Sequence, residues 1–556
     1  MRKKIISAML SALIILSLAG CGSGGAVEHA TLDTEEAVTE EAATDGDSTD
    51  EKEDTASTGD VAEVASDGDV SNVLIYAAAR DEYRDNDEGV RLYTKSYDEL
   101  YIMDEQADSF PGIKKALESY NARNSEDTEG DFDIDEMVGM AQEQYDSYDE
   151  ESKQYFSGYY DESRASVVRF DENVISIVDS TSSFLGGAHG YYANVGYTYD
   201  VQTGEELKLT DVVGDIDALK DAALEVFSRD YSELASSETE STDLLAESFD
   251  DPDTINWSMG PTYLTLYYNP YDIASYASGM QVLNIRYEYY PDIFNKGYGE
   301  SEGDWIFETS TMMEDIDGDD SLDYINFNPR VEYNEDNTYS YYSGMDIEAG
   351  GQTFTHDYEY YAYKTYIVKR NGNFYLYLVT SEDNDYKILY IYKLSTDGIE
   401  LLGQGETSFA VPNKTYENGD DYFVDYKGVF CNPDFFYVYK TMSLISTTGG
   451  VMPSHISEDG LVEPLQDYFD IPADFNLTSK IDVEGKSVDE SGNVGDKTTI
   501  PANSNCKLYR SDNETYVDLK LDDGSIVRIE IDDSDYPHTV NGIDIEEAFE
   551  GIMFAG

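Results

Sequence analysis

The chain has 556 residues, of which 116 are acidic and 35 are basic, and its formal net charge is −81. About two to four domains are expected, at roughly 150 residues per domain. So large an excess of carboxylates excludes nucleic-acid binding and docking on anionic lipid, because both need clustered lysine and arginine. The charge suits an extracellular protein with cationic partners, such as Ca²⁺ or basic proteins. It is equally consistent with a secreted protein whose charge only keeps it soluble.

The N-terminal residues have the pattern of a lipoprotein signal peptide. Three basic residues at 2–4 precede an apolar run at 5–18, which ends in Leu-Ala-Gly-Cys at 18–21. The run is shorter than the ~20 residues that a membrane-spanning helix needs. The pattern predicts a signal peptide at 1–20 and a lipidated Cys21 that anchors the chain on the extracytoplasmic face of a bacterial cell membrane. An uncleaved signal anchor is the alternative.

A linker is expected to follow the anchor. Residues 21–71 would be the lipidated cysteine and a disordered acidic spacer, because residues 22–75 contain no Phe, Trp or Tyr and cannot bury enough apolar surface to fold. Two further cysteines, Cys431 and Cys506, are either a disulfide or two separately buried thiols, and sequence spacing does not decide between them.

Residues 72–292 are predicted to form an α+β domain, with helices packed on an antiparallel sheet. Helices are expected at 110–123, at 133–148 and directly after Asp215, a helix N-cap. Strands are expected at 166–170, 174–178, 197–201, 207–209, 263–268 and 282–287. The Asp-Glu-Asn sequence at 171–173 predicts a hairpin turn between the first two of these strands.

Two sequence blocks in this segment resemble a known domain pair. The first is Gly-Gly-Ala-His-Gly at 186–190, and the second is Asn-Pro-Tyr-Asp-Ile-Ala at 269–274, about 80 residues later. Together they resemble the extracytoplasmic domains of unknown function found in front of PdaC-type peptidoglycan deacetylases and outside lysozyme-responsive anti-sigma factors. The resemblance covers residues 72–292. It implies an accessory or sensing domain, because neither the His-x-x-x-His pair of the deacetylase nor a sigma-binding segment is recognised.

His189 is the candidate ligand-binding residue of the first block, together with Tyr191 and Tyr192. The preceding glycines, 186–187, predict a loop with positive φ or a close backbone approach. His189 would either contact a ligand or metal, or form a structural hydrogen bond that locks the loop. No second histidine lies nearby in the sequence to complete a metal site. The Asn-Pro-Tyr sequence at 269–271 is expected to be a turn that closes the sheet.

Residues 303–480 follow a glycine-rich break and are predicted to be β-rich. Strands are expected at 363–369, 374–380, 386–394 and 399–402, with an Asn-Gly turn between the first two. They form a four-stranded meander, which would be a propeller blade or part of an open sheet.

An acidic loop lies in the same region. Asp315, Asp317, Asp319 and Asp323 stand at positions 1, 3, 5 and 9 of the loop. Ca²⁺ prefers about six to eight oxygen ligands from such a tight loop. The spacing resembles the calcium loops of FG-GAP/VCBS-like propeller repeats, although Asp320 stands where glycine is usual. The loop is expected to bind one structural Ca²⁺, and the alternative is a solvated acidic turn.

The C-terminal end is predicted to be a linker at 481–497 and a small β unit at 498–556. Its strands are expected at 507–510, 516–521 and 525–531, before a short helix at 544–549.

No nucleophile, phosphate-binding or dinucleotide motif is recognised anywhere in the chain. The sequence therefore predicts a non-enzymatic binding or sensing module, anchored to the cell envelope, for a cell-wall glycan or a basic protein. The alternative is a polysaccharide or peptidoglycan hydrolase, or a deacetylase-associated enzyme, whose carboxylates are not recognised among the 116 acidic residues.

Overall fold

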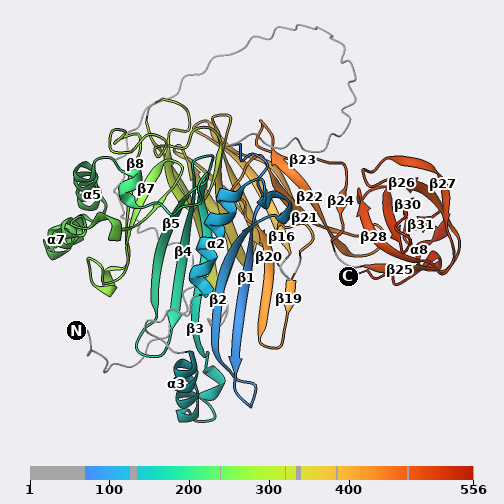
Figure 1. The fold of residues 1–556 in the computed structure, drawn as a ribbon, viewed down its shortest axis with the longest axis horizontal. Helices are drawn as coiled ribbons and strands as arrows, with labels where there is room; N and C mark the ends of the chain where they lie inside the picture. Colours follow the sequence, from blue (N-terminus) through green and yellow to red (C-terminus); the bar gives the residue numbers. More distant parts are fainter. Residues whose placement is uncertain are drawn as a thin grey trace, which may run out of the picture.

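The computed structural model describes residues 69–554, with gaps at 126–133, 238, 320, 334–339, 383–385, 415 and 473–474. The predicted signal peptide at 1–20, Cys21 and the linker up to residue 68 lie outside the described residues. Within them the chain is mainly β, with five sheets and few helices (Figure 1). None of the helices in this part of the chain combines the length and the apolar character needed to span a membrane.

A seven-stranded sheet forms the N-terminal part of the molecule, in the order β19-β20-β1-β2-β3-β4-β5. Its strands are β1 (Ile75–Asp85), β2 (Arg91–Ile102), β3 (Tyr159–Phe170), β4 (Val174–Phe184), β5 (Tyr191–Asp200), β19 (Tyr416–Asn418) and β20 (Tyr422–Gly428). The predicted hairpin between β3 and β4 is confirmed. Strands β2 and β3 are parallel, and the long connection that this requires contains helices.

Helices α2 (Pro111–Ser125) and α3 (Ile134–Ser147) confirm two of the predicted helices. Helix α2 lies across one face of this sheet, and α3 lies at the lower end of its strands (Figure 1). Helix α2 buries apolar side chains such as Leu117 against β1, β2 and β4. Helix α3 buries Met137 and Ala141 against Tyr93, near the other end of β2. A short helix, α1 (Asp104–Ala107), precedes α2.

The sheet crosses the predicted boundary between residues 72–292 and 303–480. Strand β20 pairs with β1 in antiparallel register from Tyr76 opposite Gly428 to Glu82 opposite Tyr422. A hairpin from the predicted middle region thus completes the N-terminal sheet. Local sequence pattern marks a strand but not its partner, so this pairing was not predictable.

A smaller three-stranded sheet lies beside the first. Its strands are β6 (Asn256–Met259), β7 (Tyr263–Tyr268) and β8 (Gln281–Arg286), and its helices are α4 (Leu209–Val212), α5 (Ile216–Asp230), α6 (Ser232–Ser237) and α7 (Thr239–Ser248). Asp215 caps α5 as predicted, since its side chain accepts a hydrogen bond from Ala218 N at 2.9 Å. The strand predicted at 207–209 is wrong: only an isolated bridge forms at Glu206, and α4 begins at Leu209.

Side chains of β7 alternate between two cores. Leu264 and Leu266 face the helices α5 and α7, whereas Tyr263 and Tyr267 face the sheets of the middle region. The three-stranded sheet is therefore buried on both faces, which explains its almost continuous apolar sequence.

Two sheets make up the first part of the middle region. One has the order β10-β11-β12-β13 and the other β17-β16-β15-β14-β9. Their strands are β9 (Trp305–Glu308), β10 (Thr311–Glu314), β11 (Asp323–Tyr333), β12 (Ser340–Ala349), β13 (Gln352–His356), β14 (Ala362–Arg370), β15 (Asn373–Ser381), β16 (Lys387–Ser395) and β17 (Gly398–Glu406). The predicted meander is confirmed as β14 to β17. The propeller-blade interpretation is wrong for the described residues: β9 extends the meander into a five-stranded open sheet.

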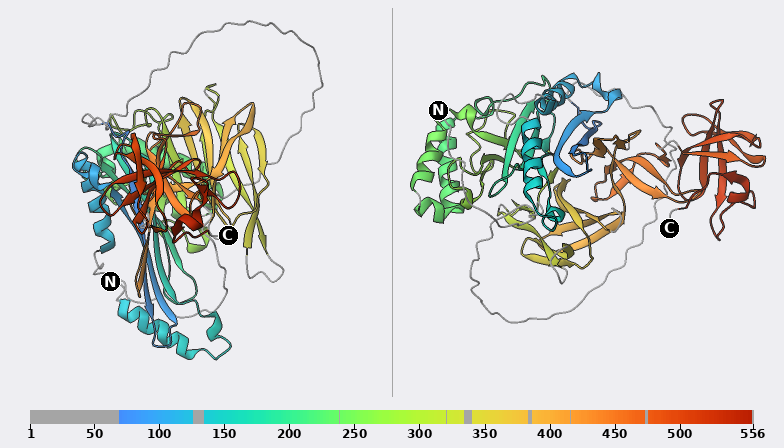
Figure 2. Two further views of the ribbon diagram at one scale, coloured as in Figure 1. Left: turned by 90° about the vertical axis from the view of Figure 1, so that its right-hand side faces the viewer. Right: turned by 90° about the horizontal axis from the view of Figure 1, so that it is seen from below.

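The remaining strands form a branched sheet that runs into the C-terminal β unit, which projects to one side of the molecule (Figures 1 and 2). They are β18 (Ser408–Ala410), β21 (Phe436–Met442), β22 (Thr448–Ile456), β23 (Val462–Pro464), β24 (Phe469–Asp470), β25 (Asn476–Ser479), β26 (Val483–Val488), β27 (Val494–Ile500), β28 (Asn505–Ser511), β29 (Tyr516–Leu521), β30 (Ile526–Asp532), β31 (Thr539–Val540), β32 (Ile543–Asp544) and β33 (Phe549–Glu550), with helix α8 (Ile545–Ala548).

Two predictions for this end of the chain are settled by the structure. Residues 481–497 are not a linker: β26 and β27 pair as a hairpin there, and β26 also pairs with β30. Cys431 and Cys506 are free and buried in different hydrophobic cores, so they are two separate thiols. Burial raises the pKa of both thiols, which keeps them protonated and unreactive.

Candidate functional site

Asparagine side chains bring the two sequence blocks together. The backbone N–H of Asn194 in β5 donates to Oδ1 of Asn269 at 2.9 Å, and Nδ2 of Asn269 donates to the Asn194 carbonyl at 3.1 Å. Beside this pair, Oδ1 of Asn256 accepts from Gly196 N at 2.8 Å. Gly196 is required here because an added Cβ would lie 1.9 Å from the Trp257 carbonyl oxygen. The edge of the large sheet is thereby fixed against the small one.

Four aromatic residues meet where the two blocks join. We call His189, Tyr192, Tyr271 and Tyr276 the aromatic cluster. The His189 ring stacks on Tyr276, with centroids 4.0 Å apart and an interplanar angle of 26°. Tyr192 packs edge-on against Tyr276 at 5.8 Å, and Tyr271 lies tilted to it at 5.7 Å. The first block supplies His189 and the second supplies Tyr271, whereas Tyr192 and Tyr276 each lie two residues after a block.

The carbonyl of Gly190 holds this arrangement in place. It accepts hydrogen bonds from the Tyr276 hydroxyl at 2.9 Å and from Nδ1 of His189 at 2.8 Å. Gly186 and Gly187 have φ of +85° and +110°, as the loop prediction requires. The hydrogen bond expected of a structural histidine is present, yet the His189 ring stays exposed, so it can still meet a ligand.

The sequence found part of this cluster. His189 and Tyr192 were predicted, and the structure brings them together. Tyr191 is adjacent and 46% exposed, and burial, followed by the charge of Asp272, raises its pKa. Tyr276 was not predicted as a site residue, although it lies only two residues after the second block. Its pKa is raised mainly by burial and then by its tyrosine neighbours, so the Tyr276 phenol stays a neutral donor.

The acidic loop connects β10 to β11. One carboxylate oxygen from each of Asp315, Asp317 and Asp323 lies within 4.8 Å of the others, a spacing that one cation could bridge. Asp323 also accepts a hydrogen bond from Ile316 N at 3.1 Å. Asp319, the fourth predicted ligand, instead accepts from Ser321 N at 2.8 Å. The structure thus gathers three of the four predicted carboxylates.

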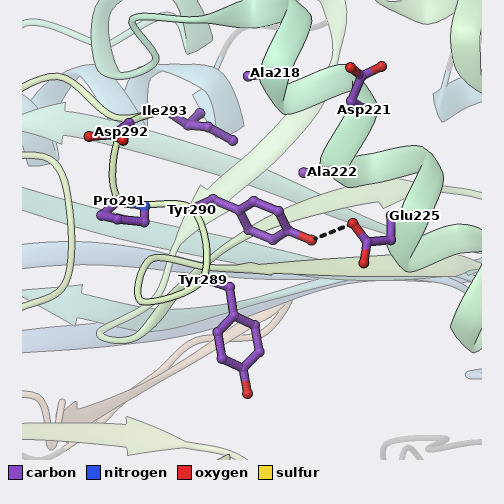
Figure 3. A pocket seen from close by; sticks show the side chains of 9 residues that line it. All are labelled: Ala218, Asp221, Ala222, Glu225, Tyr289, Tyr290, Pro291, Asp292 and Ile293. Carbon is purple, nitrogen blue, oxygen red and sulfur yellow. Dashed lines mark hydrogen bonds between the residues drawn. The ribbon is translucent and has the colours of Figure 1, made fainter.

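A groove on the small sheet's helical side was not predicted from sequence. It has a volume of about 310 Å³ and lies between α5 and the segment at 289–293 (Figure 3). Ala218 and Ala222 leave space beside the helix, and Asp221 and Asp292 stand at the rim. The Tyr290 hydroxyl donates to Glu225 at 3.1 Å across the groove. Carboxylates around a small apolar floor fit an aliphatic chain that ends in a cation.

Comparison with protein families identifies one domain. Residues 212–288, which contain α5, α7 and the three-stranded sheet, match the family described as "Protein of unknown function (DUF3298)", so the chain contains a DUF3298 domain. The match shows a domain of unknown function within the predicted segment 72–292 and does not bear on the predicted resemblance to PdaC-type or anti-sigma-factor domains. Among curated proteins, no match to the chain is found.

Solved structures of DUF3298 proteins are similar to part of the chain. A family member from Bacteroides fragilis NCTC 9343 is 20% identical, with 40% of this chain and 94% of that one covered, at a TM-score of 0.29. A DUF3298 protein from Pseudomonas aeruginosa PAO1 is 18% identical, with 41% and 96% covered, at a TM-score of 0.27. Similarity at this level locates no functional residue.

Proposed function

We propose that this protein is a non-enzymatic binding module of the bacterial cell envelope, anchored through Cys21, and that its aromatic cluster binds cell-wall glycan. The observation that carries the proposal is the stack of the exposed His189 ring on Tyr276, which joins two segments that are far apart in the sequence. Sugar rings have C–H faces that pack on aromatic rings, and their hydroxyls hydrogen-bond to polar ring edges such as tyrosine O–H.

The acidic loop has a supporting role in this proposal. Ca²⁺ held by Asp315, Asp317 and Asp323 would offset two of the three negative charges and hold β10 against β11. Strand β10 is also tied to the DUF3298 domain, because Arg286 of β8 pairs with the buried Glu314 at 3.3 Å. Calcium would therefore stabilise the contact between the two regions and would not take part in chemistry.

A second candidate function is the binding of a basic protein. The groove between α5 and residues 289–293 favours it, because Asp221, Glu225 and Asp292 surround a floor that could receive a lysine or arginine side chain. Binding of this kind would weaken steeply with salt, since exposed charge pairs are screened.

A pull-down with a parallel activity assay tests the proposal. The full chain in detergent is incubated with insoluble peptidoglycan, and retention is measured together with release of reducing sugar or acetate. We expect retention without turnover, and loss of retention for His189→Ala. The control is Tyr155→Ala, which removes a tyrosine that is 77% exposed and lies outside the cluster.

Two results would contradict the proposal. Turnover that disappears when one or two carboxylates are changed would make the chain a hydrolase or deacetylase. Retention of a basic protein but not of peptidoglycan, abolished by Glu225→Gln, would establish the second candidate instead.

A further inference from the structure

The second sequence block contains a strained tyrosine. Asn269, Pro270, Tyr271 and Asp272 form a turn in which Asp272 N donates to the Asn269 carbonyl at 3.0 Å. Proline at the second position and positive φ at the third are typical of a type II turn, and that third position normally requires glycine or asparagine. Tyr271 occupies it with φ of +77°.

No other described residue with positive φ resembles Tyr271. Apart from glycines, the residues in this conformation within the described part of the chain are all asparagines, at 371, 413, 503, 513 and 541. Asparagine tolerates the left-handed region, whereas a bulky side chain there is an outlier. Among the described residues, this backbone strain is therefore specific to Tyr271 and its turn.

Burial does not explain the presence of this tyrosine. Its side chain is 61% exposed, and the turn is held by hydrogen bonds of the backbone and of Asp272, whose carboxylate accepts from Asn269 N at 2.7 Å. Glycine or asparagine would keep all of these bonds without strain. A strained and exposed aromatic residue indicates a function for its side chain.

The charge around the cluster indicates which ligand it takes. Residues 180–199 and 273–285 contain no Asp, Glu, Lys or Arg, although 27% of the chain is charged. Asp272 is the one charged residue inside the second block, and it is engaged in the turn. A basic protein would be met by carboxylates, which are abundant elsewhere on the chain. Apart from Asp272, the two segments that form the cluster supply no charged side chain, which suits an uncharged ligand.

We propose that Tyr271 and His189 form a stacking platform for the rings of an uncharged pyranose glycan, and that Tyr271 is kept in its strained turn to present its ring to the sugar. This rests on the proposed function and names the ligand class for the same surface. The exposed hydroxyls of Ser275 and Ser278, 3.1 Å apart beside the platform, are positioned to hydrogen-bond sugar hydroxyl or amide groups.

Calorimetric titration of the full chain in detergent with chitohexaose tests this platform. We expect Tyr271→Gly to weaken binding about tenfold or more. Its melting temperature should stay equal or rise, because the strain is removed. Tyr271→Phe keeps the ring and should bind within about twofold of the parent chain. Tyr155→Gly, at an exposed tyrosine outside the cluster, should not change binding.

Varying the ionic strength and the charge of the ligand provides a second test of the platform. Between about 50 and 500 mM NaCl, affinity for the neutral sugar should change less than about twofold, because no charge pair is involved. Preference for the cationic chitosan hexamer, with steep salt dependence, would overturn the assignment of an uncharged ligand.

The remaining outcomes separate the two proposals. Chitohexaose binding that Tyr271→Gly leaves intact would overturn the platform while leaving the proposed function standing. A fall of several degrees in melting temperature for Tyr271→Gly would show that the tyrosine holds the turn, and would also overturn it. A chain that binds neither chitohexaose nor peptidoglycan would overturn the proposed function itself.

Discussion

The N-terminal sheet and the C-terminal β unit each bury an aspartate, but the two carboxylates differ in their hydrogen-bonding partners. Asp518 in β29 is fully buried between two arginines: Arg510 donates to it at 2.6 Å and Arg528 at 2.7 Å. Asp179 in β4 is 6% exposed, and its hydrogen-bonding partner is the Tyr120 hydroxyl. Burial, above all other causes, raises the pKa of Asp179 to about 6.

The C-terminal unit pairs its buried aspartate with arginines and gains stability, whereas the N-terminal sheet keeps a buried carboxylate that lowers its stability. Arg510 also donates to the carbonyls of Asp489 and Glu490 in the β26–β27 hairpin, so its network closes within the C-terminal unit. The N-terminal sheet, by contrast, keeps a poorly paired carboxylate in β4, next to the strand β5 that carries Tyr192. Natural proteins carry such locally unfavourable groups mainly at functional sites.

Breaking the C-terminal network should have the largest effect. Asp518→Ala leaves Arg510 buried, with 1% of its side chain exposed, and without its carboxylate. We expect a loss of about 3–5 kcal/mol in the unfolding free energy of this unit. Hydrogen exchange of β28 to β30 measures it. The exposed Asp533→Ala is the control, and equal protection in both variants would contradict the prediction.

Calcium should sharpen the comparison by stabilising the middle region and its contact with the DUF3298 domain. At about 100 times its dissociation constant, a single bound ion adds about 2.7 kcal/mol. Thermal melts with calcium and with chelator should therefore differ for the parent chain and coincide for Asp317→Ala. Asp319→Ala should retain most of the difference, because that side chain bonds within its own loop. Identical melts for the parent chain would leave the loop as a solvated acidic turn.

Asp179→Asn should stabilise the N-terminal sheet, because it removes a buried carboxylate that ionises at neutral pH. Because the folded pKa is raised from 3.8 to about 6, ionisation opposes folding, and the stability due to the protonated form is lost as pH rises through 6. The variant should be more stable by about 2 kcal/mol above pH 7 and gain little near pH 4. Urea unfolding across this pH range measures it, and a pH-independent difference would point to packing instead.

His189→Ala should produce the smallest change, and one confined to binding. Loss of one stacking ring is expected to weaken glycan binding about tenfold, or about 1.4 kcal/mol. The histidine is exposed, so the melting temperature should change little. Titration with chitohexaose, with Tyr155→Ala as control, checks it. Full affinity in the variant would assign His189 a purely structural role.

Local sequence determined most of the elements of this protein. The cap at Asp215 predicted α5, the Asn-Gly turn at 371–372 predicted the β14–β15 hairpin, and the glycines at 186–187 predicted a loop with positive φ. These features depend on neighbours within a few residues, which is why periodicity and turn chemistry reveal them. His189, Tyr192 and the loop aspartates were selected in the same way, and their binding roles stay predictions.

Tertiary structure alone decided which of these elements meet. Three contacts show this: the pairing of β20 with β1, the hairpin at 483–500, and the stacking of Tyr276 on His189. In each of them the local sequence does not indicate which partner a residue will contact. Strands β26 and β27 are rich in polar residues and were mistaken for a linker, because a solvated strand lacks the apolar alternation that predicts one. Strand pairing depends on burial and backbone hydrogen bonds across the whole chain, and those exist only in the folded molecule.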